Sequence, residues 1–227
     1  MMTIVLENGG EVSQREQFQV RKLLASTLFS AGQSDEARAV IEPGADALTK
    51  FAFDGFVGDW DTAEAIYRDV AKTRSQLDDD PGALAAYGDL VWLLEREMTV
   101  FRRNALPDRL VDGYTPLTWY QILAGQFDLA IKTARKGLAL ENTSGEKLGL
   151  KINLAHALLL NNEVPEAMTL YDPVKSAIFS QPSSAPQRLV AHEVLDDLDE
   201  LAKRGMTRPQ MDEIRASMRA AIDKPGQ

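Results

Sequence analysis

The sequence predicts an all-α fold, and three observations support this prediction. Apolar residues recur at intervals of three and four along almost the whole chain, which is the period of one face of an α-helix. No segment sustains the alternation of a β-strand, apart from a possible short "TIVL" near the start. Glycine, or asparagine in its place, interrupts the apolar pattern where one helix of a pair would end and the next begin.

Four helices are expected in the first half of the chain. The first covers residues 12–31 and ends at Gly32, because glycine tolerates the positive φ of a helix C-terminus. A second helix is expected over 34–41, where Pro43 and Gly44 should stop it. A short apolar segment then leads to a third helix over 60–77. The fourth and longest, 81–105, carries one apolar stripe made of Leu84, Tyr87, Val91, Leu94, Met98 and Phe101.

The second half is expected to hold two helical hairpins followed by a separate pair. A loop over 108–113 should lead to four helices between Thr115 and Lys175. The segment "SQPSSAPQ", residues 180–187, has the composition of a linker. The domains expected are therefore a disordered arm over 1–11, a repeat domain over 12–179, this linker, and a capping helical pair over 188–223. The start resembles the interior of a longer polypeptide. Two interpretations are therefore kept, that the chain is a fragment and that it is a complete protein.

Charge and composition restrict the partners. The formal net charge is −9 and the isoelectric point is about 4.8, which disfavours nucleic acid and anionic membranes, since both are bound through clustered Lys and Arg. The absence of cysteine excludes disulfides and thiolate chemistry. No signal peptide and no apolar segment of 18 residues is found, so the expectation is a soluble, cytoplasmic protein without direct membrane insertion.

A short motif occurs twice, as "AGQSDEA" at 31–37 and "AGQFDLA" at 124–130. The glycine suits the tight turn inside a helical hairpin, and the final alanine suits a place where two helices cross closely. This pattern resembles the tetratricopeptide repeat, whose consensus unit has about 34 residues. The best unit starts at Val111, another starts at Phe18, and a third starts at Leu148 with Asn162 in place of the turn glycine.

The repeat is irregular between Pro43 and Gly113. Ala37, Ala63, Ala130 and Ala167 are interpreted as the signature alanines, although their spacing departs from multiples of 34. Trp60, Ala63 and Tyr67 match only the second half of a unit, and the long helix 81–105 replaces a further unit. The expected architecture is thus an α-α solenoid of antiparallel hairpins with an irregular long central helix and a C-terminal cap. The alternative is a generic α-hairpin solenoid.

The resemblance implies a non-enzymatic scaffold that presents a concave groove to a peptide or another protein. In this family the groove is lined by the first helix of each unit. The residues of this chain at the matching positions are Lys22, Ser26, Phe29, Thr115, Trp119, Ile122, Ile152, Asn153, His156 and Leu159. A second copy of the chain, paired through the stripe from Leu84 to Phe101, is a further partner that the sequence allows. The alternative function is a regulatory or sensor C-terminal module of a larger bacterial signalling or proteolytic protein.

No set of residues in the sequence predicts a catalytic, cofactor or metal site. "HEVLD" at 192–196 comes near the helical zinc motif, but Asp196 stands where that motif requires histidine. His156 is the only other histidine, and the glycines form neither a phosphate loop nor a dinucleotide fingerprint. The expectation is a protein that is not an enzyme and needs no cofactor.

Overall fold

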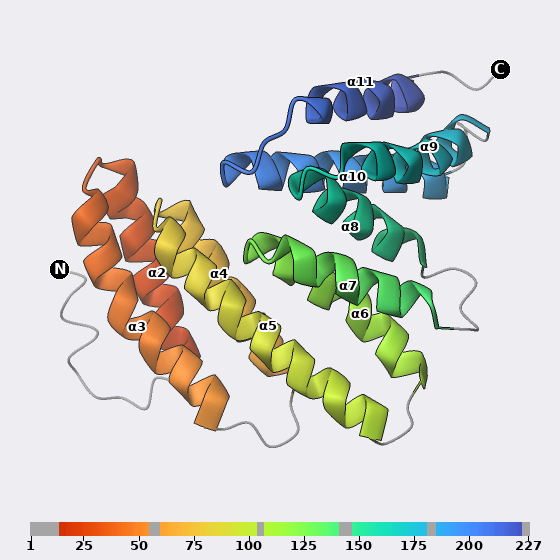
Figure 1. Cartoon of the computed structure of the whole chain (residues 1–227). Helices are drawn as coiled ribbons and strands as arrows, with labels where there is room; N and C mark the ends of the chain where they lie inside the picture. Colours follow the sequence, from red (N-terminus) through yellow and green to blue (C-terminus); the bar gives the residue numbers. More distant parts are fainter. Residues whose placement is uncertain (1–13, 55–59, 104–106, 141–146, 181–184, 224–227) are drawn as a thin grey trace. The chain divides into compact units, whose positions relative to one another are not determined.

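The computed structural model describes residues 14–54, 60–103, 107–140, 147–180 and 185–223. The described residues are almost entirely helical and include no strand, so the all-α prediction is confirmed (Figure 1). The helices are α2 (Gln14–Ser30), α3 (Ser34–Asp54), α4 (Trp60–Gln76), α5 (Asp80–Arg103), α6 (Pro107–Leu123), α7 (Phe127–Leu138), α8 (Lys147–Leu160), α9 (Val164–Ser180), α10 (Ala185–Lys203) and α11 (Gln210–Asp223).

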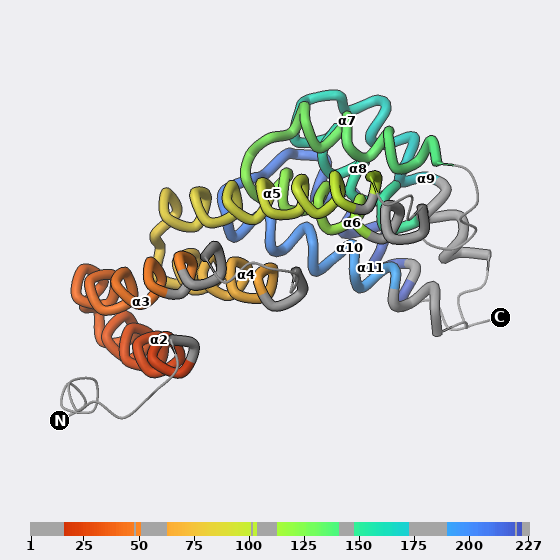
Figure 2. Tube along the Cα trace, turned by 90° about the horizontal axis from the view of Figure 1, so that it is seen from below, coloured from red at the N-terminus to blue at the C-terminus, as the bar shows by residue number. Residues whose placement is uncertain are grey.

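The chain divides into two compact units, Met1–Glu97 and Met98–Gln227. In the first unit α2 packs along α3, and α3 packs against α4 (Figures 1 and 2). In the second unit α6 contacts α7 and α8, α8 contacts α9, and both helices of the α10–α11 pair contact α9. Consecutive helices therefore form antiparallel pairs that stack on their neighbours within each unit, as predicted.

Five inner turns share one backbone design. Gly32, Asp78, Gly125, Asn162 and Gly205 all have positive φ, between 53° and 80°. After each of them, the next residue donates its N–H to the carbonyl oxygen five residues earlier, at 2.8–3.0 Å. This is the hydrogen bond of a Schellman turn, which satisfies a carbonyl that the ending helix leaves open. The chain thus uses one device to close every described hairpin.

A buried alanine follows four of these turns at the same distance. Ala37, Ala83, Ala130 and Ala167 each stand five residues after the turn residue, and none is more than 2% exposed. The fifth turn is followed by Gln210 in that place. A methyl side chain at this position lets the second helix lie close against the first.

The turns correct the predicted repeat length. They stand at 32, 78, 125, 162 and 205, so successive hairpins are 46, 47, 37 and 43 residues apart, each longer than a 34-residue unit. The two copies of the heptapeptide are therefore two hairpins apart. Ala83, not Ala63, is the signature alanine of the second hairpin, and α4 is the first helix of that hairpin instead of a second half.

Pro43 does not end the second helix, contrary to the prediction. Helix α3 continues through it to Asp54, with Ala45 fully buried two residues further on. Proline removes the N–H that would bond the carbonyl of Ala39 and so loosens the helix there. The Arg21 side chain compensates by donating from Nη1 to the adjacent carbonyl, that of Val40, at 3.1 Å.

Two further predictions about helix bounds have different outcomes. The loop expected over 108–113 is wrong, because α6 begins at Pro107, where a proline costs no hydrogen bond in a first helical turn. The long helix is confirmed as α5, and it has no internal turn. The arm over 1–11 lies outside the described residues, as do residues 181–184 of the expected linker. The other half of that segment is helical, since Ser180 belongs to α9 and 185–187 belong to α10.

The apolar stripe of α5 is part of the core. Tyr87, Val91, Leu94 and Met98 are at most 4% exposed, and only Leu84, at 46%, remains accessible; the side chain of Phe101 lies outside what is described. The expectation that this stripe can pair with a second copy is therefore wrong. Among the described helices, none combines the length and apolar character that crossing a membrane requires.

Candidate functional site

The predicted groove residues of the first unit lie on α2. The Nζ atom of Lys22 is 2.5 Å from Oδ1 of Asp69 on α4, and Gln19 donates from Nε2 to the other carboxylate oxygen at 2.8 Å. Ser26 is exposed and Phe29 is half-buried. Lys22 thus already joins α2 to α4, whereas Ser26 and Phe29 leave surface that a partner can reach.

In the second unit, the groove positions of α6 differ in accessibility. Thr115 and Trp119 are half-buried, and Ile122 is fully buried. The backbone carbonyl of Thr115 accepts a hydrogen bond from Nδ2 of Asn153 on α8, at 3.0 Å. The amide that the resemblance assigns to a peptide backbone is therefore engaged in holding α8 against α6.

The groove positions of α8 are all inside the unit. Ile152, His156 and Leu159 are at most 1% exposed, and Asn153 is 6% exposed. Their side chains face neighbouring helices of the unit. Whether any of the predicted groove residues binds a partner stays a prediction, but Thr115 and Trp119 are those of the second unit that have accessible surface.

His156 is the centre of a polar cluster in the core of the second unit. Its Nδ1 shares a hydrogen bond of 2.6 Å with the hydroxyl of Tyr171 on α9, and its Nε2 is 3.4 Å from Oδ2 of Asp197 on α10. The ring of Trp119 packs on the imidazole, with centroids 6.3 Å apart. One buried side chain thus touches α6, α9 and α10, and its contact on α6 is the accessible ring of Trp119.

Sequence reasoning did not find the partners of His156. Tyr171 and Asp197 are separated from it along the chain and belong to no motif, so only the packing of α8 between α9 and α10 brings the three together. Arg208, after the turn at Gly205, was missed for the same reason: it donates to the carbonyl of Leu160 and, at 3.1 Å, to Oδ1 of Asn162.

The cluster shifts two titrating groups. Burial, and secondarily the Asp197 carboxylate, raise the pKa of the Tyr171 phenol well above its ordinary value, so the hydroxyl keeps its proton as a hydrogen-bonding group. Glu193 is exposed on α10, but partial burial of its carboxyl, and secondarily the negative charge of Asp197, raise its pKa above the ordinary value of 4.5, against a smaller opposing effect of His156. Ionisation of Glu193 therefore destabilises the folded state.

Glu193→Gln is expected to stabilise the chain at pH 7 to 8 and to lose that advantage towards pH 4. A carboxyl with a raised pKa binds its proton more tightly in the folded state, so its unfavourable contribution grows as the pH rises from 4.5 through the folded-state pKa. Urea unfolding of both proteins across this pH range measures the difference. Glu213→Gln, on the exposed side of α11, is the control for removing one negative charge. A variant less stable than the wild type at pH 7 would contradict the assignment.

No metal centre is formed by the residues described. Among them no three His, Cys, Asp or Glu side chains are grouped so as to hold an ion, and His192, Glu193 and Asp196 of the "HEVLD" segment are all exposed on α10. The second unit instead has an accessible surface on α6, where the ring of Trp119 contacts the buried imidazole of His156 and lies next to the half-buried Thr115.

No family model and no curated protein matches the chain. Two solved structures are similar to it: the kinesin light chain "nearly identical TPR-like repeats" of Podosopora anserina, at 17% identity and a TM-score of 0.42, and their Q17M variant, at 16% identity and a TM-score of 0.43. Each alignment covers 93% of this chain and 97% of the other. The stack of antiparallel helical hairpins predicted from the sequence is confirmed by the chain's own helix contacts and repeated turns.

Proposed function

We propose that the chain is a non-enzymatic interaction scaffold that binds a peptide segment of another protein along the first helices of its hairpins. The observation that carries the proposal is the placement of Trp119. Its ring is half-buried on α6 and rests on the fully buried His156, which is itself tied to Tyr171. A large aromatic side chain that is both accessible and rigidly held is typical of a binding hot spot, because little conformational entropy is lost when a partner covers it.

The neighbouring groups suit an uncharged contact. Thr115 lies one turn before Trp119, and its hydroxyl-bearing side chain is half-buried. A partner segment with one apolar anchor against Trp119 fits this surface better than a carboxylate does, because the predicted basic groove residue, Lys22, is engaged with Asp69 in the other unit. The first unit offers Ser26 and Phe29 as a second, separate contact surface.

Affinity capture with the full chain tests the proposal. Trp119→Ala is expected to lose a defined set of captured proteins at least about tenfold, whereas Trp119→Phe retains them, because an aromatic anchor is worth about 2 kcal/mol or more. Leu129→Ala is the matched control, since Leu129 is also accessible, at 38% exposure, but lies on α7, the second helix of the same hairpin. Helical content by circular dichroism must be equal in all four proteins.

The proposal fails if well-folded Trp119→Ala captures the same proteins in the same amounts as the wild type and Leu129→Ala. Ser26→Arg supplies an independent variant in the first unit, since an exposed serine can be replaced without disturbing the core. The alternative function, a regulatory or sensor C-terminal module of a larger bacterial signalling or proteolytic protein, stays a prediction.

A further inference from the structure

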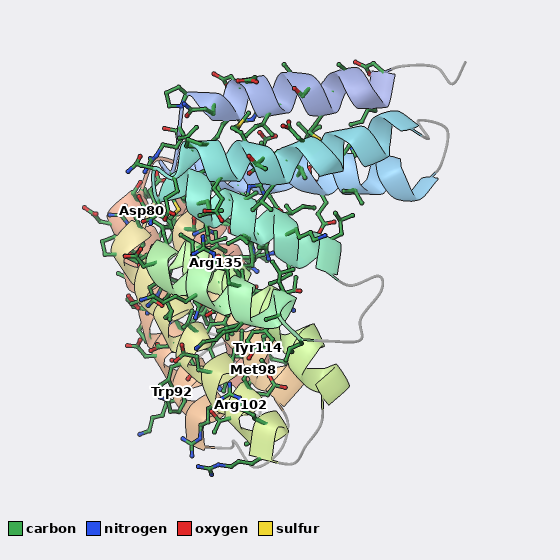
Figure 3. All side chains as sticks on the ribbon, turned by 45° about the vertical axis from the view of Figure 1, so that its right-hand side comes forward. Asp80, Trp92, Met98, Arg102, Tyr114 and Arg135 are labelled. Atoms are coloured by element: carbon green, nitrogen blue, oxygen red, sulfur yellow. The ribbon has the colours of Figure 1, made fainter. Side chains whose placement is uncertain are left out.

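Helix α5 also carries an accessible ridge, which begins beside the N-terminal end of its buried stripe and winds around the helix away from it. The ridge consists of five residues spaced four apart: Asp80, Leu84, Gly88, Trp92 and Arg96. Leu84 and Trp92 are 46% and 42% exposed, although they are large apolar side chains, and Asp80 and Arg96 are exposed as well. Asp80 and Trp92 are labelled on this helix in Figure 3. All five belong to the first unit.

The middle residue of this ridge, Gly88, has no side chain. A methyl carbon added there would meet no atom within 4 Å, so space is open above the helix between Leu84 and Trp92. Residues four apart form the ridges that interdigitate in the commonest class of helix packing, with axes crossing at about −50°. A small residue at the crossing point lets two backbones approach closely. The ridge therefore has the form of a helix-packing surface with its crossing point at Gly88.

The order of the ridge is complementary to itself. From either end, the ridge has a charged residue, then an apolar residue, then the central glycine. The two end residues, Asp80 and Arg96, carry opposite charges. Two copies that cross antiparallel at Gly88 place Trp92 of each against Leu84 of the other. The same register places Arg96 of each copy near Asp80 of the other. A two-fold interface needs a surface that matches itself in this way.

We propose that this ridge, named here the α5 ridge, is the contact surface of a reversible homodimer with its two-fold axis at Gly88. The guanidinium of Arg96 lies over the Trp92 ring, 5.3 Å from its centroid, which holds the long side chain along the ridge. The guanidinium edge still carries N–H groups that can meet a carboxylate. Glu95, beside the ridge, falls opposite Pro81 in this register and so meets no like charge directly.

The size of the surface determines the strength of the dimer. One pair of crossing helices buries less area than a stable interface of about 1,200 Å² or more, so the dimer is weak and forms at high protein concentration. The proposal is independent of the groove on α6, because the two surfaces lie on different helices. Loss of dimerisation and loss of partner capture are therefore separate results.

Sedimentation velocity of the full chain over a concentration series tests the dimer. The wild type is expected to shift from monomer to dimer, and Gly88→Gln is expected to raise the dissociation constant at least about tenfold by filling the crossing point. Because a Cβ added at Gly88 meets no atom within 4 Å and glutamine favours a helix more than glycine does, this variant is expected to fold. Ala216→Gln, on an exposed position of α11, is the matched control and should dimerise like the wild type. A wild type that stays monomeric up to about 1 mM, or a Gly88→Gln chain that dimerises equally well, overturns the proposal.

Charge exchange tests the register. Asp80→Lys and Arg96→Glu each place like charges opposite one another across the two-fold axis, so each alone should dimerise less than the wild type. An equimolar mixture of the two variants restores opposite charges at both ends, and it is expected to form a heterodimer more strongly than either variant self-associates. Asp79, not Asp80, accepts the hydrogen bond from the N–H of Gly82 at the start of α5, so the helix cap is retained. A mixture that associates no better than the separate variants rejects this register.

Discussion

Gly137→Ala is expected to lower the free energy of unfolding by about 2 kcal/mol, because the added methyl group has no room. Gly137 is buried on α7 where that helix crosses α6 and α8. A carbon placed there would lie 2.8 Å from Cβ of Tyr114 and 2.5 Å from a methyl carbon of Leu150. The leucine can rotate away, but Cβ of Tyr114 is fixed to its backbone, so α6 and α7 must move apart. Urea unfolding followed at 222 nm measures the change.

Gly88→Ala is the matched control, and its effect should have the opposite sign. Both glycines lie inside a helix, so alanine should gain about 0.5–1 kcal/mol of helix propensity at either position. At Gly88 no neighbour opposes that gain. Equal effects of the two substitutions would show that close packing at Gly137 does not limit the side chain there.

Arg74→Met is expected to cost the first unit about 2 kcal/mol of stability, because one side chain connects three helices. From α4, the Arg74 guanidinium donates from Nη2 to Glu42 at 2.6 Å and to Asp46 at 3.3 Å, both on α3. It also donates from Nη1 to the carbonyl of Gly82 on α5 at 3.3 Å. Its side chain is only 12% exposed, whereas Glu42 and Asp46 are largely solvated, which limits the cost to this size.

Arg74→Lys separates the charge from the shape of the guanidinium. Lysine keeps the positive charge but cannot reach acceptors on both sides at once, so most of the loss should remain. Hydrogen exchange read by mass spectrometry should show weaker protection in α3 and α4, with α8 and α9 unchanged. Asp89 offers a second readout: burial raises its pKa against the lowering effect of Arg74, and the Met variant should raise that pKa further. Unchanged protection in α3 would contradict this role.

The turns show how far the sequence predicts the fold. Glycine at 32, 125 and 205 marks a turn because it adopts positive φ without strain, and the asparagine at 162 is the next best residue. Asp78 makes the same turn with φ of 53°, but inside "DDDPG" its three aspartates indicate only a helix boundary. Without a recognisable turn at Asp78, the sequence places α4 in the wrong half of a hairpin, and the 34-residue length is taken from the resemblance and not from the turns.

The prediction that Pro43 ends a helix is wrong for a different reason. A proline in the middle of a helical pattern predicts an end, because it removes one hydrogen bond and crowds the preceding turn. In α3 that local cost is offset by contacts that are distant in sequence, namely the bond from Arg21 to Val40 and the burial of Ala45. Periodicity cannot report such contacts. It could therefore predict that α2 and α3 pair but not how long α3 is.

The groove residues are predicted only from their positions in the repeat, and these positions do not determine whether a side chain is accessible to a partner. Trp119 and His156 occupy matching positions in neighbouring hairpins, yet one is half-exposed and the other is fully buried. The difference arises because Tyr171 and Asp197 enclose His156, and neither residue carries a recognisable motif. The face of each helix could be read from the sequence, whereas the packing of the next hairpin on that face could not.

The repeated turns also have a consequence for how the chain folds. Each turn joins two helices that are adjacent in sequence, so the first contacts that form close short loops and cost little chain entropy. Any hairpin can then serve as a starting point, and folding can spread to the neighbours that stack on it. A chain built in this way should fold quickly and in several small steps, and mild denaturant should release its hairpins at different concentrations.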